Sequence, residues 1–187
     1  MKILSTMLAI AAACLFAVHA PAAMAAQPGG LAKESAYCTQ KGGAVQERQP
    51  YYGTNGSSPL RLSGEQYFCE FTSQKDGSQI SVLLGTLWTK LPTLAALAYY
   101  AEVAYNGNCT GSPGSCYCSQ IGGTDLFGGI DGAGGGWVLT TDSNDVLDTC
   151  IFPDMSTIDS YGLFYHSAGI IRGKDLSKVL RFQNPYS

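Results

Sequence analysis

Two closely similar nine-residue phrases constrain the fold of this chain more than any other feature of its sequence. The phrases are SAYCTQKGG at residues 35–43 and SCYCSQIGG at residues 115–123, and each has a Tyr-Cys dipeptide and a glycine pair in the same register. A further cysteine follows each phrase at nearly the same spacing, since Cys69 lies 31 residues after Cys38 and Cys150 lies 32 residues after Cys118. The sequence therefore predicts two copies of one small disulfide-closed module.

The first residues have the features of a secretory signal peptide. Lys2 precedes an apolar stretch, and a small-residue segment suits cleavage after Ala25. We therefore expect residues 1–25 to be removed, which leaves a periplasmic or secreted protein of about 160 residues with no transmembrane segment. Two alternatives stay open at this stage: a retained membrane anchor, and a lipoprotein attached through Cys14.

Six cysteines remain after the signal peptide, and an even number in an exported chain implies disulfides. If the two modules share one fold, Cys38 pairs with Cys69 and Cys118 pairs with Cys150. Small modules need such bridges because their cores are small. The remaining two cysteines then close the short CTGSPGSC loop, so the predicted disulfide residues are Cys38, Cys69, Cys109, Cys116, Cys118 and Cys150.

Each module is expected to begin with a short helix that carries its first cysteine, at residues 35–41 and 114–121. The glycine pairs that follow end these helices, because glycine takes the left-handed conformation without strain. Two strands come next. In the second module TDLF and GWVLTT flank a loop containing Asp131 and Gly132, a dipeptide that favours a hairpin turn.

Later helices complete each module. We expect helices from near Ser78 and from near Ser156, since serine is a good N-cap, and a longer helix over PTLAALAYYAEVAY, whose apolar residues recur at helical spacing and predict a core stripe. Asp175 is expected to cap a last, shorter helix. The predicted fold is α+β, with two tandem αββα-type modules at 31–106 and 109–187 that pack through apolar helices.

Charge is unevenly distributed along the chain. Removal of Lys2 leaves ten Lys and Arg against fourteen Asp and Glu, a net formal charge of −4 that argues against a nucleic-acid partner. Between Lys90 and Arg172 there is no basic residue, whereas seven aspartates fall in that interval. Two interpretations stay open: a solvated acidic face covered by a basic tail, or a docking face for a basic partner or a cation.

A set of spaced residues in the second module forms a recognisable pattern: Tyr117, Cys118, Gly122, Gly123, Cys150, Phe152, Pro153, Asp154 and Ser156. In these residues the module resembles a family of small exported bacterial proteins, a domain of unknown function that carries a hemolysin label. The family repeat reads approximately NPAS-x-YC-x-x-x-GG and then C-x-FPDGS-x-C-x-x-W. Ile158 stands where the family has its next cysteine, and Tyr161 replaces its Trp. The resemblance implies an envelope protein of unsettled function, and we infer no pore formation from it.

Groups that could support catalysis are few. His166 is the only histidine after the signal peptide, and its apolar and aromatic neighbours favour a structural role, because a general base needs a positioned partner. The alternative is an envelope hydrolase or lytic factor in which His166 works with Asp159 or Asp154. No G-x-S-x-G nucleophile elbow and no H-E-x-x-H zinc pattern occurs in the sequence.

Cofactor and metal sites are not expected. The glycine-rich GGIDGAGGGW does not fit a dinucleotide-binding motif, because Trp137 occupies the place of its last glycine. TDSNDVLD departs from a calcium-binding EF-hand loop at Val146 and Leu147. Exposed tyrosines with Asn and Gly are instead typical of recognition surfaces, and the loop aspartates belong to the acidic face that could dock a basic partner. The predicted binding residues are Tyr51, Tyr52, Asp131, Trp137, Asp142 and Asp145.

The sequence thus favours a non-enzymatic exported binding protein of inhibitor, immunity or adaptor type. Loops on a rigid frame are where recognition usually lies, and we expect the partner to be a protein or a component of the bacterial envelope. The rival interpretation is the hydrolase built on His166. A purely structural envelope component is the third possibility.

Overall fold

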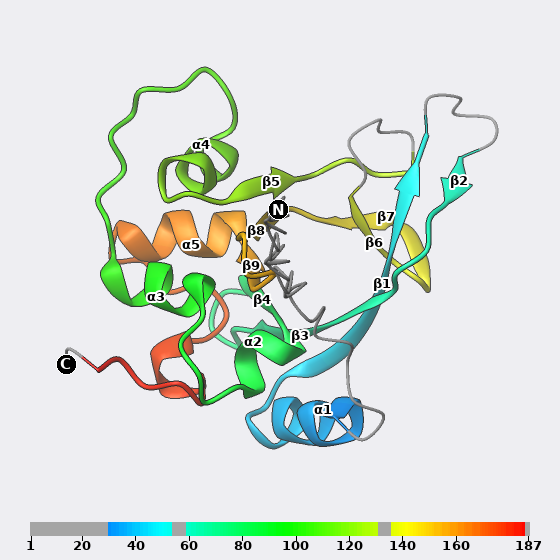
Figure 1. The fold of residues 1–187 in the computed structure, drawn as a ribbon, viewed down its shortest axis with the longest axis horizontal. Helices are drawn as coiled ribbons and strands as arrows, with labels where there is room; N and C mark the ends of the chain where they lie inside the picture. Colours follow the sequence, from blue (N-terminus) through cyan, green and yellow to red (C-terminus); the bar gives the residue numbers. More distant parts are fainter. Residues whose placement is uncertain (1–29, 54–58, 131–135, 186–187) are drawn as a thin grey trace, which may run out of the picture.

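The structure, a computed structural model, describes residues 30–53, 59–130 and 136–185, and it has the α+β composition that the sequence predicts (Figure 1). The helices are α1 (Gly30–Gln40), α2 (Leu84–Trp88), α3 (Leu94–Ala101), α4 (Pro113–Gln120), α5 (Ser160–Ser167) and the 3₁₀ turn η1 (Leu176–Lys178). The strands are β1 (Ala44–Tyr52), β2 (Leu60–Arg61), β3 (Gln66–Thr72), β4 (Gln79–Leu83), β5 (Thr124–Leu126), β6 (Trp137–Leu139), β7 (Asp142–Leu147), β8 (Thr149–Ile151) and β9 (Thr157–Asp159).

One continuous sheet joins the strands of both halves of the chain. Its order is β5-β8-β9-β4-β3-β1-β6-β7, and β2 pairs with the end of β1. The strand pairs are antiparallel, and the two halves meet at β4 and β9, where Val82 lies opposite Ile158. The sheet also curls, because β7 at one edge leads through Asp148 directly into β8 near the other edge.

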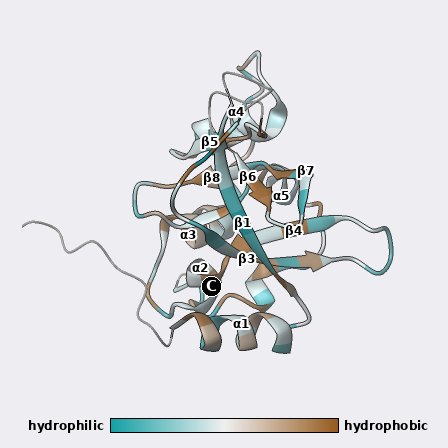
Figure 2. Ribbon diagram, turned by 90° about the vertical axis from the view of Figure 1, so that its right-hand side faces the viewer, coloured by the Kyte–Doolittle hydropathy of each residue, from teal (hydrophilic) through white to brown (hydrophobic). Residues whose placement is uncertain are grey.

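The two faces of this sheet differ in character. Alternation along each strand sends Cys69, Phe71, Ile80 and Val82 to one face, where they join the buried apolar core beneath the helices. Most alternate positions of the same strands are polar, as at Glu70 between two of these core residues, whereas Phe68 is an apolar exception that packs near Trp137. Figure 2 shows the same polarity along much of β1, which is drawn in teal. The main core cluster therefore lies against one face of the central strands.

The three predicted disulfides are confirmed: Cys38–Cys69, Cys109–Cys116 and Cys118–Cys150. The first bridge ties α1 to β3, and the third ties α4 to β8. Both helices end as expected at a glycine in the left-handed region, with φ of 84° at Gly42 and 90° at Gly122.

The expected hairpin between TDLF and GWVLTT is wrong. β5 pairs with β8, so that Asp125 lies opposite Cys150, whereas β6 pairs with β1 and β7. The turn signal at Asp131 and Gly132 lies outside the described residues. The segment GWVLTT thus joins the strand system of the first half, because long-range pairing with β1 replaces the local hairpin.

Two helices begin later than the sequence predicts. Strands β4 and β9 occupy the positions after Ser78 and Ser156, and α2 and α5 start only at Leu84 and Ser160. Both serines instead close Asp-x-Ser turns, in which Ser78 donates its backbone N–H to Asp76, as Ser156 does to Asp154. An apolar segment that follows a serine is compatible with a helix or with a strand, and pairing within the sheet makes these two segments strands.

The long helix is also shorter than expected. α3 begins after Thr93, whose side chain accepts a hydrogen bond from the Ala96 N–H, and it stops at Glu102, which has φ of 45°. Its buried residues are Ala95, Ala96 and Tyr99. The predicted core stripe is confirmed in part: Leu97, Ala98 and Tyr105 pack against the core, whereas Leu94 is 42% exposed. With Leu94 and Ala101, Leu97 and Ala98 also line a surface groove. Asp175 caps the last turn as predicted, although only the 3₁₀ turn η1 follows it.

Candidate functional site

A polar cavity of about 200 Å³ lies on the face of the sheet that the helices leave uncovered. The central strands β3 and β4 form one side, and β7 faces them because the sheet curls. Both halves of the chain contribute lining residues. They are Arg48, Glu70, Gln79, Ser81, Asp145, Val146, Leu147, Asp148, Asp159, Tyr161 and Arg172.

Arg48 is the most deeply buried charge of this cavity, with 1% of the residue exposed. Its guanidinium donates to the Asp145 carboxylate at 3.0 Å and to the carbonyl oxygens of Asp145 and Trp137, both at 3.2 Å. Two further bonds go to the Gln46 side chain. Arg48 therefore fastens β6 and β7 to β1, and Asp145 neutralises its charge.

Asp159 joins the cavity to the core. One carboxylate oxygen accepts the Gly162 N–H and so caps α5, while the other accepts the Ser81 N–H at 2.8 Å. Burial raises the pKa of Asp159 to about 6, although the two backbone N–H donors and the nearby Arg172 favour its charged form. This carboxyl is thus positioned by the backbone of β4 and α5 rather than by a directly paired cation.

Two more aspartates lie close to Asp159 at the junction of β5, β7 and α5. Burial and the neighbouring Asp125 raise the pKa of Asp148. Asp125 accepts a hydrogen bond from the hydroxyl of Ser160, but its second carboxylate oxygen finds no partner among the described residues. Of these three aspartates, Asp148 and Asp159 line the cavity, where Arg172 is the nearby lining cation, so acidic groups outnumber basic groups at this end.

The predicted binding residues are not brought together. Asp145 lines the cavity, and Trp137 contributes its carbonyl oxygen to Arg48. Tyr51 and Tyr52 lie at the end of β1, opposite Arg61 and Leu60 of β2. The remaining two predicted residues are Asp142, which is exposed and accepts the Asn144 N–H, and Asp131, which lies outside the described residues.

Several lining residues were missed by the sequence reasoning: Glu70, Ser81, Tyr161 and Arg172. A signal for Glu70 was present, because it stands between Cys69 and Phe71, and alternation in a strand sends it away from the core. Buried Arg48 gave no such signal, since arginine is mostly a surface residue. The basic C-terminal segment meets the acidic cavity only through Arg172, whereas Arg181 stacks on Trp88 at 3.6 Å.

His166 lies away from both of the aspartates proposed as its partners. It is 8% exposed, its ring stacks on Tyr99 with a centroid distance of 3.6 Å, and its Nε2 lies 3.3 Å from Glu102 Oε1. Burial lowers the pKa of His166, and Glu102 opposes this shift. Asp154 instead accepts the Leu94 N–H and the Ser156 hydroxyl. His166 thus has a carboxylate partner, but it does not line the polar cavity.

A second, apolar groove of about 340 Å³ lies between α3 and the segments that follow α4 and β8. It is lined by Leu94, Leu97, Ala98, Ala101, Ile121, Gly122, Phe152 and Pro153. In the described part of the chain no cluster of three or more His, Cys, Asp or Glu side chains is arranged to bind a metal ion. The polar cavity is therefore the stronger candidate for recognition of a charged group.

No protein-family model, curated protein or solved structure matches this chain. Of the helices that the structure describes, none has the length and apolar character needed to cross a lipid bilayer.

Proposed function

We propose that this protein is an exported, non-enzymatic binding protein of the bacterial cell envelope, of inhibitor, immunity or adaptor type, whose polar cavity receives a basic group of its partner. The charge of the cavity carries this proposal. Once Arg48 is paired with Asp145, the carboxylates of Glu70, Asp148 and Asp159 face Arg172 alone. A guanidinium or ammonium group would offset this excess of negative charge.

The proposed frame consists of two copies of one disulfide-closed module. In each half a cysteine-bearing helix is bridged to a strand, and Gly43 and Gly123 lie against their disulfides in the same way, so that a Cβ there would come within 2.3 Å of a cysteine sulfur. The Val82–Ile158 pair joins β4 to β9. On one side of this junction lie β9, β8 and β5 of the second half, and on the other lie β4, β3 and β1 of the first half. These correspondences support an approximate twofold relation, and the resemblance to the exported bacterial family agrees with it.

The recognition surface of this proposal also includes Tyr51 and Tyr52. Tyr52 is 41% exposed at the end of β1, and aromatic side chains with polar neighbours are typical of protein interfaces. A protein partner would contact these tyrosines and place one basic side chain in the cavity. Three disulfides support export, because such bridges persist in oxidising compartments.

Titration with a small cation tests the cavity directly. Arginine amide is added to the mature protein, and ¹H–¹⁵N spectra are recorded for Glu70→Gln, Asp148→Asn and the control Asp142→Asn, whose carboxylate is exposed outside the cavity. We expect binding that is at least tenfold weaker in the two cavity variants and unchanged in the control. Equal effects of all three variants, or no saturable shift in the wild type, would exclude the cavity as a cation site.

Capture from an envelope extract tests the protein partner. The mature protein is immobilised beside the double variant Tyr51→Ala/Tyr52→Ala and the Glu70→Gln variant. We expect a partner that the immobilised wild type retains to be retained in smaller amount by the double tyrosine variant and by the Glu70→Gln variant. Undiminished capture by the tyrosine variant would remove these residues from the proposed surface.

The alternative, an envelope hydrolase or lytic factor, is favoured by one observation, the 3.3 Å approach of His166 Nε2 to Glu102. Such a pair could position a general base. Its test is release of soluble fragments from purified cell-wall material by wild type and by His166→Gln. Release by the wild type that the variant lacks would favour the enzyme, whereas no release by either favours the binding protein.

A further inference from the structure

The three disulfides differ sharply in their accessibility. Cys38, Cys69, Cys118 and Cys150 are completely buried, with 0% of each residue exposed. In the remaining bridge Cys116 is 5% exposed, but its partner Cys109 is an exposed residue. A thiolate must reach a sulfur atom along the line of the S–S bond to attack it, so access controls the rate of exchange. Of the three bridges, Cys109–Cys116 alone presents an accessible cysteine.

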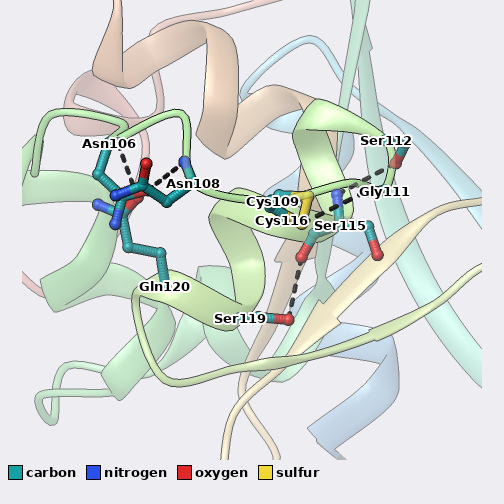
Figure 3. The surroundings of a disulfide bond; sticks show 9 residues. All are labelled: Asn106, Asn108, Cys109, Gly111, Ser112, Ser115, Cys116, Ser119 and Gln120. Carbon is teal, nitrogen blue, oxygen red and sulfur yellow. Dashed lines mark hydrogen bonds between the residues drawn. A yellow bond between two sulfur atoms is a disulfide. The ribbon is translucent and has the colours of Figure 1, made fainter.

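The backbone around these cysteines reinforces the difference. Cys69 and Cys150 lie on strands that have a neighbour on each side, β3 between β1 and β4, and β8 between β5 and β9. Cys109 lies in the irregular segment 103–112 that joins the two halves of the chain. Figure 3 shows its disulfide beside the first turn of α4, with Gly111 close to the sulfurs. Among the three bridges, this one alone has neither of its cysteines on a strand of the sheet.

The two sulfurs also differ in their surroundings. The Gly111 N–H lies 3.4 Å from Cys109 Sγ and donates to it. Cys116 lies in the first turns of α4, after the Ser112 cap, and its backbone N–H donates to the Ser112 carbonyl at 2.9 Å. Cys109 is therefore the accessible target, and Cys116, which is only 5% exposed, is the thiolate that leaves.

We infer that Cys109–Cys116 is a thiol–disulfide exchange site that accepts a thiolate from a protein or a small-molecule thiol of the envelope. The incoming thiolate attacks Cys109 Sγ and forms a new S–S bond with it. The bond to Cys116 breaks, and Cys116 leaves as a thiolate that then takes a proton from water. The reverse attack of Cys116 on Cys109 expels the incoming thiol and restores the bridge.

The opened bridge leaves the joining segment anchored by other contacts. The Tyr117 hydroxyl donates to the Val103 carbonyl at 2.8 Å, and the Gln120 side chain binds both the Ala104 carbonyl and the Asn106 N–H, at 2.8 and 2.9 Å (Figure 3 shows Asn106 and Gln120). These bonds involve no sulfur. The protein is therefore able to carry a mixed disulfide at Cys109 while the sheet and both buried bridges stay intact.

Limited reduction tests the inference with the two buried bridges as internal controls. The folded protein is treated with graded amounts of glutathione, quenched in acid, alkylated and digested with chymotrypsin, because the chain lacks Lys and Arg between residues 90 and 172. We expect Cys109 and Cys116 to be modified at least tenfold faster than the other four cysteines, with glutathione first attached to Cys109. Equal modification of all three bridges, or a first adduct on Cys116, would overturn the inference.

A second measurement separates exchange from unfolding. The double variant Cys109→Ser/Cys116→Ser is compared with the matched variant Cys118→Ser/Cys150→Ser by circular dichroism and thermal melting. We expect the first to keep the wild-type spectrum and the second to show the larger fall in melting temperature. Loss of the folded spectrum in the first variant would show that the bridge is structural and would contradict a role in exchange. The mass of the adduct trapped on Cys109 in an envelope extract would show whether the incoming thiol belongs to a protein or to glutathione.

Discussion

Gly43 and Gly123 illustrate how single residues determine the local geometry of this protein. Neither glycine has the positive φ that would exclude other residues. An added Cβ, however, would lie 2.3 Å from Cys69 Sγ at Gly43 and 2.3 Å from Cys150 Sγ at Gly123. Because the buried disulfides have no room to move, we expect Gly43→Ala and Gly123→Ala each to lower the free energy of unfolding by about 1–3 kcal/mol. Denaturant titration measures this change.

The matched control is Gly85→Ala in α2. A Cβ at Gly85 would meet no atom within 4 Å, and alanine is the better helix former, so the stability should stay constant or rise by about 0.5–1 kcal/mol. A control as damaging as the two disulfide-contacting variants would show that glycine is needed there for some other reason.

Asp159 makes stability depend on pH. Its pKa is about 6 in the folded protein and near 3.8 when unfolded, so between these values the folded state binds more protons. Stability should therefore fall as pH rises from about 4 to about 6, by up to about 3 kcal/mol, and then level off. Asp159→Asn should reduce this slope, as measured by denaturant titration at several pH values. An unchanged slope in the variant would contradict the assignment.

At the scale of elements, the turn between β8 and β9 contains a conformational conflict. Met155 has φ of 65° and is 69% exposed, whereas the matching Asp-x-Ser turn before β4 has Gly77 at this position, with φ of 72°. The left-handed region costs an L-residue about 1–2 kcal/mol. Replacement by glycine removes that strain but adds entropy to the unfolded chain.

We expect Met155→Gly to raise the free energy of unfolding by about 0.5–1 kcal/mol, and Gly77→Ala, the reciprocal change, to lower it by about 1 kcal/mol. Thermal melting of both variants measures the difference. A lower melting temperature for Met155→Gly would mean that the methionine side chain contributes contacts that outweigh its backbone strain.

For the whole molecule, the continuous sheet predicts that both halves unfold together. Val82 and Ile158 pair across the boundary, and β6 from the second half pairs with β1 from the first. We expect C38A/C69A and C118A/C150A each to lose about 3–4 kcal/mol, the chain-entropy value for loops of this length, with one calorimetric transition in both cases. Two separate transitions in either variant would show independently folding halves.

Local features were predictable from the sequence. The disulfide pairs, the two cysteine-bearing helices and their glycine ends depend on spacing and on backbone preferences within a few residues, and the structure confirms them. The predicted starts of α2 and α5 were wrong because Ser78 and Ser156 serve a turn as well as they serve a helix cap. Short apolar segments are similarly ambiguous between strand and helix.

Strand partners and the polar cavity were not predictable in this way. Alternation alone indicates that Glu70 points away from Cys69, but the side chains that it faces depend on the position of β7, and so on pairing between residues about ninety positions apart. The covalent bridges were predictable from the sequence because the two similar phrases place their cysteine pairs at nearly equal spacing, and the structure has these pairs. The charged cavity depends on the curl of the sheet that brings β7 to face β3 and β4, because burial and mutual proximity of carboxylates are properties of the folded molecule.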